Sequence, residues 1–78
     1  MPAKDVVIKV DGVETTTTDK QGIYYLTFDK IPGTYEIEVE SPRHYIEPMT
    51  VRVDENLRQL PPIVARAVYL CGGVLLID

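Results

Sequence analysis

Three glutamates at alternating positions form the densest group of potential ligands in this sequence. Glu36, Glu38 and Glu40 are each separated by one residue, so on an extended strand their carboxylates would project from one face. Such a row could bind a cation or dock a basic partner protein. The same row is also typical of a solvated strand face, which keeps a sheet soluble. We favour the solvated face, because hard cations usually take ligands from loops as well, and keep an interaction surface as the alternative.

The single histidine and the single cysteine lack the neighbours that catalysis requires. His44 stands beside Arg43 and Tyr45, with no nucleophile or acid at a recognisable spacing. Cys71 has no Cys–His pattern, and its apolar neighbours predict a packing role, with pairing to a cysteine of another domain as the alternative. We therefore expect no catalytic residue, no cofactor-binding residue and no metal ligand.

Two further groups of polar residues are explained by structural roles. Asp19, Gln21 and Asp29 lie in or near a turn, but the spacing and the closing glutamate of a calcium-binding EF-hand are absent. The five tyrosines could form a platform for a carbohydrate or a peptide. We expect most of them to be core residues with polar tips at the rim of the fold; they are Tyr24, Tyr25, Tyr35, Tyr45 and Tyr69.

The composition indicates one small acidic domain over residues 1–78. The chain has 78 residues, 45% of them hydrophobic, and a net charge of −4 at pH 7. This charge argues against a nucleic-acid partner or an anionic membrane surface. One cysteine cannot form an internal disulfide. The longest apolar run, Val74 to Ile77, is too short to span a bilayer, and the first residues show no signal-peptide pattern.

The elements that would position these residues are strands, because the hydrophobic period is two. In residues 34–40, Tyr35, Ile37 and Val39 alternate with polar residues, as in a strand with one buried face. Residues 24–28, 51–53 and 6–10 alternate in the same way. Thr15 to Thr18 is a β-branched run that favours a strand.

Turn residues separate these runs at short intervals. Asp11-Gly12 predicts a two-residue hairpin of type I′, and Asp19 to Gly22 predicts a turn with a left-handed glycine. Pro32-Gly33 predicts a type II turn with positive φ at the glycine. Pro48 predicts an edge strand or a break. The structural turn residues are thus Gly12, Asp19, Gly22, Pro32 and Gly33.

The segment from Ile63 to Leu70 is compatible with a short helix or a strand. We favour a strand, because the segment is rich in β-branched residues and shows no polar face at helical spacing. Gly72-Gly73 should then break it, with Val74 to Ile77 forming another short strand. Six or seven short strands without a convincing helix predict an all-β sandwich or Greek-key domain.

Two stretches together resemble a known family of β-sandwiches. Residues 18–24 read T-D-K-Q-G-I-Y and residues 31–39 read I-P-G-T-Y-E-I-E-V. This succession resembles the carboxypeptidase-regulatory-like, or transthyretin-like, family with an Ig-like (prealbumin-like) sandwich, and the likeness covers roughly residues 6–53. Ser41-Pro42, Tyr45, Glu47-Pro48 and residues 51–53 are most similar to luminal repeats of the nodal-modulator type. They are next most similar to the single domain of the seventh subunit of the endoplasmic-reticulum (ER) membrane protein complex.

The resemblance implies a non-enzymatic structural or protein-interaction repeat in the ER lumen, in a membrane protein that assists membrane-protein biogenesis. It implies protein partners, namely neighbouring repeats and subunits of membrane-protein complexes, with no nucleic acid and no membrane insertion by this segment. Members of the family have a first strand before the position of Val6. Only a few residues precede Val6 in this sequence, so we expect that strand to be missing. Residues 71–78 look like the first strand of a next repeat. We expect Val74 to Ile77 to fold back into the vacant position or to be exchanged in a strand-swapped dimer.

Two alternative functions belong to other classes. One is a carbohydrate- or peptide-binding accessory module of a secreted or surface protein, which exposed aromatic side chains would favour and buried tyrosines would oppose. The other is a hydrolase of the transthyretin-like kind, which would need clustered histidine and arginine; a single histidine argues against it.

Overall fold

The computed structural model describes residues 4–41, 45–65 and 68–75, and these residues form seven β-strands. None of these residues is helical, so the predicted all-β class is confirmed. The strands are β1 (Val7–Val10), β2 (Val13–Thr17), β3 (Ile23–Leu26), β4 (Gly33–Glu40), β5 (Met49–Val53), β6 (Ile63–Ala65) and β7 (Val68–Val74).

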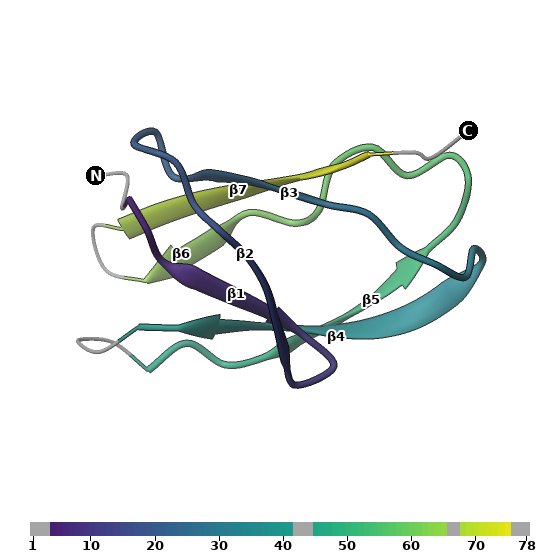
Figure 1. Ribbon diagram of the computed structural model, residues 1–78, viewed down its shortest axis with the longest axis horizontal. Helices are drawn as coiled ribbons and strands as arrows, with labels where there is room; N and C mark the ends of the chain where they lie inside the picture. The colour runs from purple at the N-terminus through teal and green to yellow at the C-terminus, as the bar shows by residue number, and fades with distance from the viewer. Residues whose placement is uncertain (1–3, 42–44, 66–67, 76–78) are drawn as a thin grey trace.

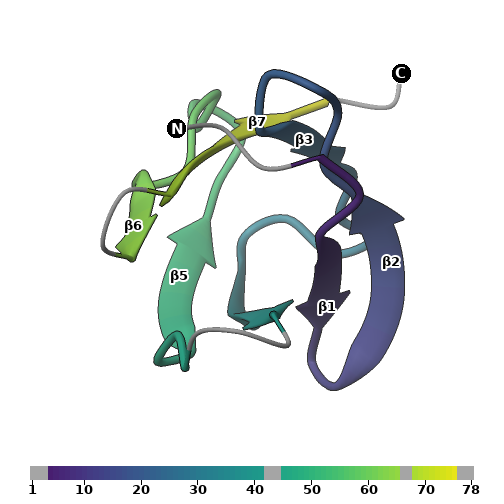
Figure 2. The same cartoon turned by 90° about the vertical axis from the view of Figure 1, so that its left-hand side faces the viewer.

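The strands form two sheets that enclose the core between them. One sheet has four antiparallel strands in the order β2-β1-β4-β5, and the other has three in the order β3-β7-β6. In Figure 1, β3 and β7 run above β4 and β5, and Figure 2 shows the two layers edge-on. Strand β5 lies at an edge of its sheet and begins directly after Pro48, which confirms the edge predicted from that proline, because proline has no N–H for a ladder.

The predicted hairpin between β1 and β2 is confirmed. Asp11 and Gly12 have φ angles of 50° and 83°, the positive values that a type I′ turn requires. The turn also contacts the neighbouring strand: the Asp11 N–H donates to the Glu36 carbonyl, and the Glu36 N–H donates to Asp11 Oδ1, both at 2.9 Å. The hairpin is therefore anchored to β4.

The turn at Asp19 to Gly22 also forms as predicted. Gly22 has a φ of 78°, and Asp19 Oδ1 accepts hydrogen bonds from the N–H groups of Gln21 at 2.8 Å and Ile23 at 3.0 Å. The Asp19 side chain thus takes the place of a backbone partner and leads the chain into β3.

The predicted type II turn at Pro32-Gly33 is wrong. The Ile31–Pro32 peptide bond is cis, and Gly33 does not have a positive φ; it is instead the first residue of β4. A Cβ at Gly33 would lie 2.7 Å from the Lys30 carbonyl oxygen and 3.0 Å from the Tyr35 ring. Glycine is needed here for close approach to these groups and not for backbone conformation.

The final segment is extended, as favoured over a helix, but it forms two antiparallel strands instead of one, and the predicted break at the two glycines is wrong. The segment forms β6 and β7, with Ile63 opposite Leu70, and β7 continues through Gly72 and Gly73 to Val74. A Cβ at Gly72 would lie 2.5 Å from the Tyr24 ring, and one at Gly73 would lie 2.9 Å from the Tyr25 ring. The glycines admit two tyrosine rings from β3, so they lie inside a strand.

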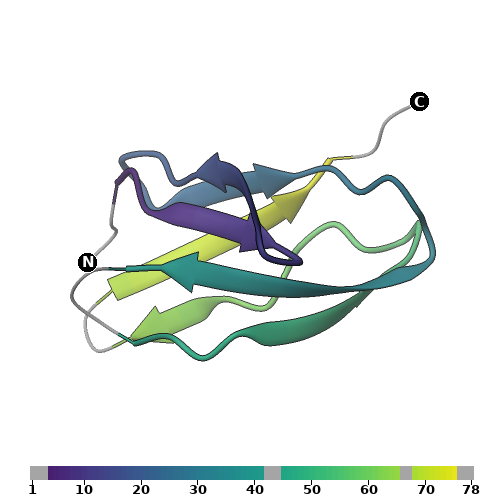
Figure 3. The ribbon, with the colours of Figure 1, turned by 60° about the horizontal axis from the view of Figure 1, so that its bottom comes forward.

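Strand β7 pairs in parallel with β3, with Ile23 opposite Cys71 and Leu26 opposite Val74. Figure 3 shows the two strands side by side and pointing the same way. Residues up to Val74 therefore belong to a sheet of this same chain. Of the separate strand predicted for Val74 to Ile77, Val74 belongs to β7, Leu75 is in no strand, and the other two residues lie outside the described residues. Exchange of this segment between two chains stays a prediction.

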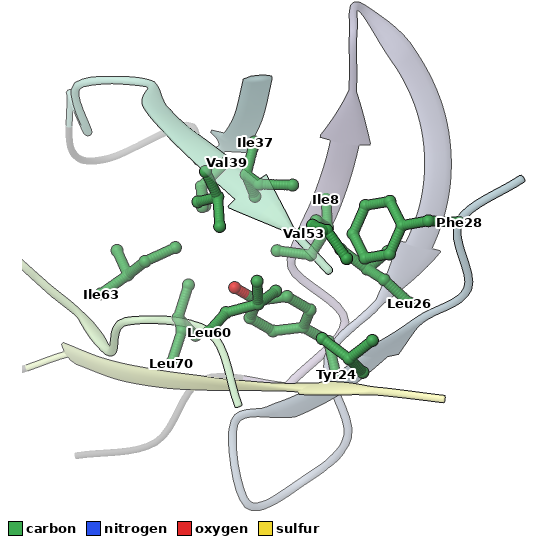
Figure 4. Close-up of a cluster of buried hydrophobic side chains, with 12 residues drawn as sticks. Ile8, Tyr24, Leu26, Phe28, Ile37, Val39, Val53, Leu60, Ile63 and Leu70 are labelled. Atoms are coloured by element: carbon green, nitrogen blue, oxygen red, sulfur yellow. The ribbon is translucent and has the colours of Figure 1, made fainter. Parts of the chain in front are cut away.

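The core is formed by the inward residues of both sheets. Residues of the four-stranded sheet face residues of the three-stranded sheet (Figure 4), and the Tyr24 ring lies over Gly72 of β7. The alternation predicted for residues 24–28, 34–40 and 51–53 is confirmed, because the inward residues are buried, apart from the half-buried Tyr35, and the residues between them are exposed or half-buried. In residues 6–10, Ile8 is buried, whereas Val6 and Val10 are half-buried. The buried hydrophobic residues are Ile8, Tyr24, Leu26, Phe28, Ile37, Val39, Val51, Val53, Leu60, Ile63, Leu70 and Val74.

Candidate interaction surfaces

The acidic ridge of Glu36, Glu38 and Glu40 lies on the outer face of β4, as the alternation predicts. Glu36 and Glu40 are exposed, and Glu38 is half-buried beside Lys9 of β1. Lys9 Nζ lies 3.8 Å from Glu40 Oε1, so a lysine partly balances the ridge. Among the described residues, no group of three or more His, Cys, Asp or Glu side chains is arranged to hold a metal ion.

The other polar candidates are distributed over separate turns. Asp19 has the turn-capping geometry described above, and its partner atoms are backbone N–H groups. Asp29 is exposed, and no hydrogen bond joins it to Asp19. His44 lies outside the described residues. The structure therefore does not bring Asp19 and Asp29 together, since they lie at opposite ends of β3.

The tyrosines divide into two buried or anchored rings and three exposed ones. Tyr24 is only 1% exposed. Tyr35 is half-buried against Phe28, with ring centroids 4.6 Å apart, and its hydroxyl donates to the Lys30 carbonyl at 2.7 Å. Tyr25 and Tyr69 are each 53% exposed and Tyr45 is 87% exposed. The expectation that most tyrosines are core residues is thus wrong for these three. Tyr25 and Tyr69 point outward because β3 and β7 have apolar residues on both of their faces, and Tyr45 lies outside the strands.

The outer side of the three-stranded sheet is an uncharged face that the sequence analysis missed. It consists of the outward residues Ile23, Tyr25, Val64, Tyr69, Cys71 and Gly73. None of these residues is Asp, Glu, Lys, Arg or His, although Tyr25, Val64, Tyr69 and Cys71 are exposed to solvent. Apolar side chains on an exposed sheet face are the usual mark of a contact surface. We call this surface the uncharged face.

The register of the strands arranges the uncharged face in rows. Cys71 lies beside Ile23, Gly73 lies beside Tyr25, and Tyr69 lies opposite Val64. The Tyr25 ring lies over Gly73, where a Cβ would approach it to 2.9 Å. Small residues thus follow the centre of the face along β7, with Tyr69 at one end and the Tyr25 ring at the other.

Cys71 is exposed, which corrects the packing role predicted for it. Alternation along β7 turns Leu70 and Val74 inward and therefore turns Cys71 outward. The sequence does contain a signal for the uncharged face: Ile63 and Val64, Tyr69 and Leu70, and Tyr24 and Tyr25 are apolar pairs, and one member of each pair must point away from the core.

The Tyr24 hydroxyl is the one buried side-chain polar atom without a hydrogen-bond partner in the described part of the chain. Burial of the phenol, together with a smaller contribution from Cys71, raises the pKa of Tyr24 to about 12. The hydroxyl lies on the inner side of β7, over Gly72, and so belongs to the core and not to the uncharged face.

Comparisons with protein-family models, with curated proteins and with solved structures gave no match. In the described ranges, no helix is long and apolar enough to cross a membrane.

Proposed function

We propose that this chain is a non-enzymatic protein-interaction domain that meets its partners through the uncharged face. The observation that carries the proposal is the set of exposed apolar side chains, Tyr25, Val64, Tyr69 and Cys71, on one sheet of an acidic domain. Contact surfaces between proteins are depleted in charge at their centres and enriched in tyrosine. This face has both properties.

The finer identity is a transthyretin-like, carboxypeptidase-regulatory-like sandwich from the luminal part of an ER membrane protein that assists membrane-protein biogenesis. This identity is supported by the sequence resemblance over residues 6–53 and by the arrangement of seven strands in two sheets. In this role the domain is a rigid spacer. Its loops and sheet faces contact neighbouring domains and subunits of membrane-protein complexes.

Site-specific photo-crosslinking in the ER lumen tests this proposal. A benzophenone amino acid replaces Tyr69 in one version of the chain and Thr50, an exposed residue on the opposite sheet, in a control version. We expect position 69 to cross-link to ER membrane proteins, identified by mass spectrometry, and position 50 to give few products. Equal cross-linking from both positions would contradict the proposal.

A carbohydrate- or peptide-binding module is the second candidate, favoured by the exposure of Tyr25 and Tyr69 on one sheet face. Aromatic side chains of this kind stack on ligands. Titration of the isotope-labelled chain with soluble oligosaccharides or peptides, followed by NMR, distinguishes the candidates. Saturable shifts at Tyr25 and Tyr69 would support the second candidate, and unchanged spectra at millimolar ligand would exclude it for the ligands used.

A further inference from the structure

We infer that two copies of this chain pack their uncharged faces together, sheet against sheet, about a twofold axis that crosses β7 at Cys71. The inference rests on the proposed function and deepens it by naming one partner, a second copy. Three features of the described residues support it: the distribution of charge, the order of residue sizes along β7, and the state of the other sheet edges.

Charge decides which faces two copies can bring together. Each copy has a net charge of −4, so the copies repel each other wherever their carboxylates meet. The outer face of the four-stranded sheet carries the carboxylates of the acidic ridge and of Glu14, against the cations Lys9 and Arg52. The uncharged face has no charged residue in its described part. Two copies can therefore cover it without burying a carboxylate.

The order of side-chain sizes along β7 is self-complementary. Consider a twofold axis that lies midway between the facing three-stranded sheets of the two copies and passes over Cys71 at right angles to β7. This axis makes the two β7 strands antiparallel. It places Tyr69 of one copy over Gly73 of the other, where the Tyr25 ring lies. Two equivalent Tyr69–Tyr25 contacts result, and aromatic rings attract each other at centroid separations of ~4.5–7 Å. An isologous interface needs this kind of repeated pairing.

The small Cys71 side chains occupy the centre of this arrangement. Stacked sheets lie ~10 Å apart, whereas the Cα atoms of a disulfide are usually ~4.4–6.8 Å apart. The two Cys71 residues would therefore face each other across the axis without forming a bond. Association would depend on the apolar and aromatic contacts around them.

The long edge at β2 is less suited to pairing with a second copy. The register between β1 and β2 shifts by one residue between Ile8 and Lys9, which leaves Thr15 as an extra residue in β2. Such bulges twist an edge strand and hinder the addition of another strand. The other edge of this sheet is β5, which is directly preceded by Pro48. Proline has no N–H to donate to an added strand.

Sedimentation velocity over a range of concentrations tests the inference on the full chain. We expect the unsubstituted chain to form a dimer, and Tyr69→Glu to weaken dimerisation at least about tenfold, because a carboxylate would be buried twice per dimer. Val13→Glu is the matched control, since Val13 is 66% exposed on the other sheet and should leave the dimer unchanged. Urea unfolding of each variant establishes that it remains folded.

Alkylation of Cys71 provides a second readout. Cys71 is the single cysteine of the chain and is exposed in one copy, whereas the dimer would cover it with the facing sheet. We expect a maleimide to react slowly with the unsubstituted chain at concentrations where it is dimeric and quickly with folded Tyr69→Glu. Monomeric sedimentation at every concentration would overturn the inference, as would a dimer that survives Tyr69→Glu, which would indicate strand exchange or another surface.

The outcomes separate this inference from the proposed function. A monomer whose position 69 still cross-links to other ER proteins would overturn the dimer and leave the proposed function intact. A dimer in which position 69 cross-links only to a second copy would support the inference and would contradict the part of the proposed function that assigns other ER membrane proteins to this face.

Discussion

At the scale of single residues, the hydroxyl groups of Tyr24 and Tyr35 differ in their hydrogen bonding, although both rings lie in or near the core. The Tyr35 hydroxyl is satisfied twice by Lys30, accepting from its N–H at 3.1 Å and donating to its carbonyl at 2.7 Å. The Tyr24 hydroxyl is buried without a partner in the described part of the chain. A buried polar group without a hydrogen bond costs ~1–3 kcal/mol. The Tyr24 ring must therefore stabilise the core mainly through its apolar surface.

Tyr24→Phe is expected to remove an alkaline loss of stability. Burial raises the pKa of Tyr24 to about 12 from its usual value near 10, so the unfolded chain releases this proton first. The stabilisation linked to this proton is fully present below pH 10 and is lost as the pH rises towards 12, by about 2–3 kcal/mol in all. Urea unfolding at pH 7 and between pH 9 and 12 measures both states.

At pH 7, Tyr24→Phe should unfold with the same free energy as the unsubstituted chain or with about 1 kcal/mol more. Tyr35→Phe is the control: it should be about 1 kcal/mol less stable at pH 7, because its hydrogen bonds with Lys30 are lost, and should keep the alkaline decline. An alkaline decline of unchanged size in Tyr24→Phe would show that another group causes it.

At the scale of strands, the pairing of β3 with β7 depends on the two adjacent glycines. Gly72 lies under the buried Tyr24 ring, and Gly73 lies under the exposed Tyr25 ring. The inner ring has no space into which it can move, because interiors are close-packed. The outer ring can turn away into solvent. Two neighbouring glycines in one strand should therefore respond very differently to the same substitution.

Gly72→Ala is expected to destabilise the fold by about 3 kcal/mol or more, through overpacking against the Tyr24 ring. Gly73→Ala serves as its matched partner and should cost less than about 1 kcal/mol. Thermal or urea unfolding of the two variants gives the comparison. If the two costs were equal, steric contact with Tyr24 would not be the reason for glycine at position 72.

Much of the fold could be predicted from the sequence, because alternation and turn residues are local signals. The inward faces of β3 and β4 and the turns at Asp11-Gly12 and Asp19 follow from neighbouring residues alone. The role of Gly72 and Gly73 could not be predicted, since it depends on rings from a strand far away in the sequence. Pro32-Gly33 is equally ambiguous, because the same dipeptide suits trans and cis turns.

Of the two candidate surfaces, one could be predicted from the sequence and the other could not. The acidic ridge could be located from its alternation alone. The uncharged face could not, because the apolar pairs that signal it are equally typical of a strand that is covered on both faces. Only the position of the three-stranded sheet, with one face turned to the core and the other turned outward, identifies which of those residues are exposed.

At the scale of the whole molecule, β7 completes the sandwich. It is the central strand of its sheet, between β3 and β6, and it contributes Leu70 and Val74 to the core. Without it, β3 and β6 would not be joined, and one side of the core would be open.

Residues 1–65 alone are therefore expected to lack a cooperative unfolding transition. A synthetic peptide of residues 66–78 should restore the transition, with a midpoint that rises with peptide concentration. A control peptide with Val74→Asp should fail, because Val74 is 5% exposed and a buried carboxylate is costly. Circular dichroism during urea titration measures this. A cooperative transition of residues 1–65 without peptide would show that β7 is dispensable.

The position of β7 in the topology also affects folding during translation. The four-stranded sheet is fully translated once Val53 has been added, but its inner face stays uncovered until Val74 follows. At ~5–20 residues per second this interval lasts about one to four seconds. During that time, Ile8, Ile37 and Val53 are open to solvent on a nascent chain. Chaperones should therefore engage the domain during this interval and release it once β7 has emerged and paired with β3.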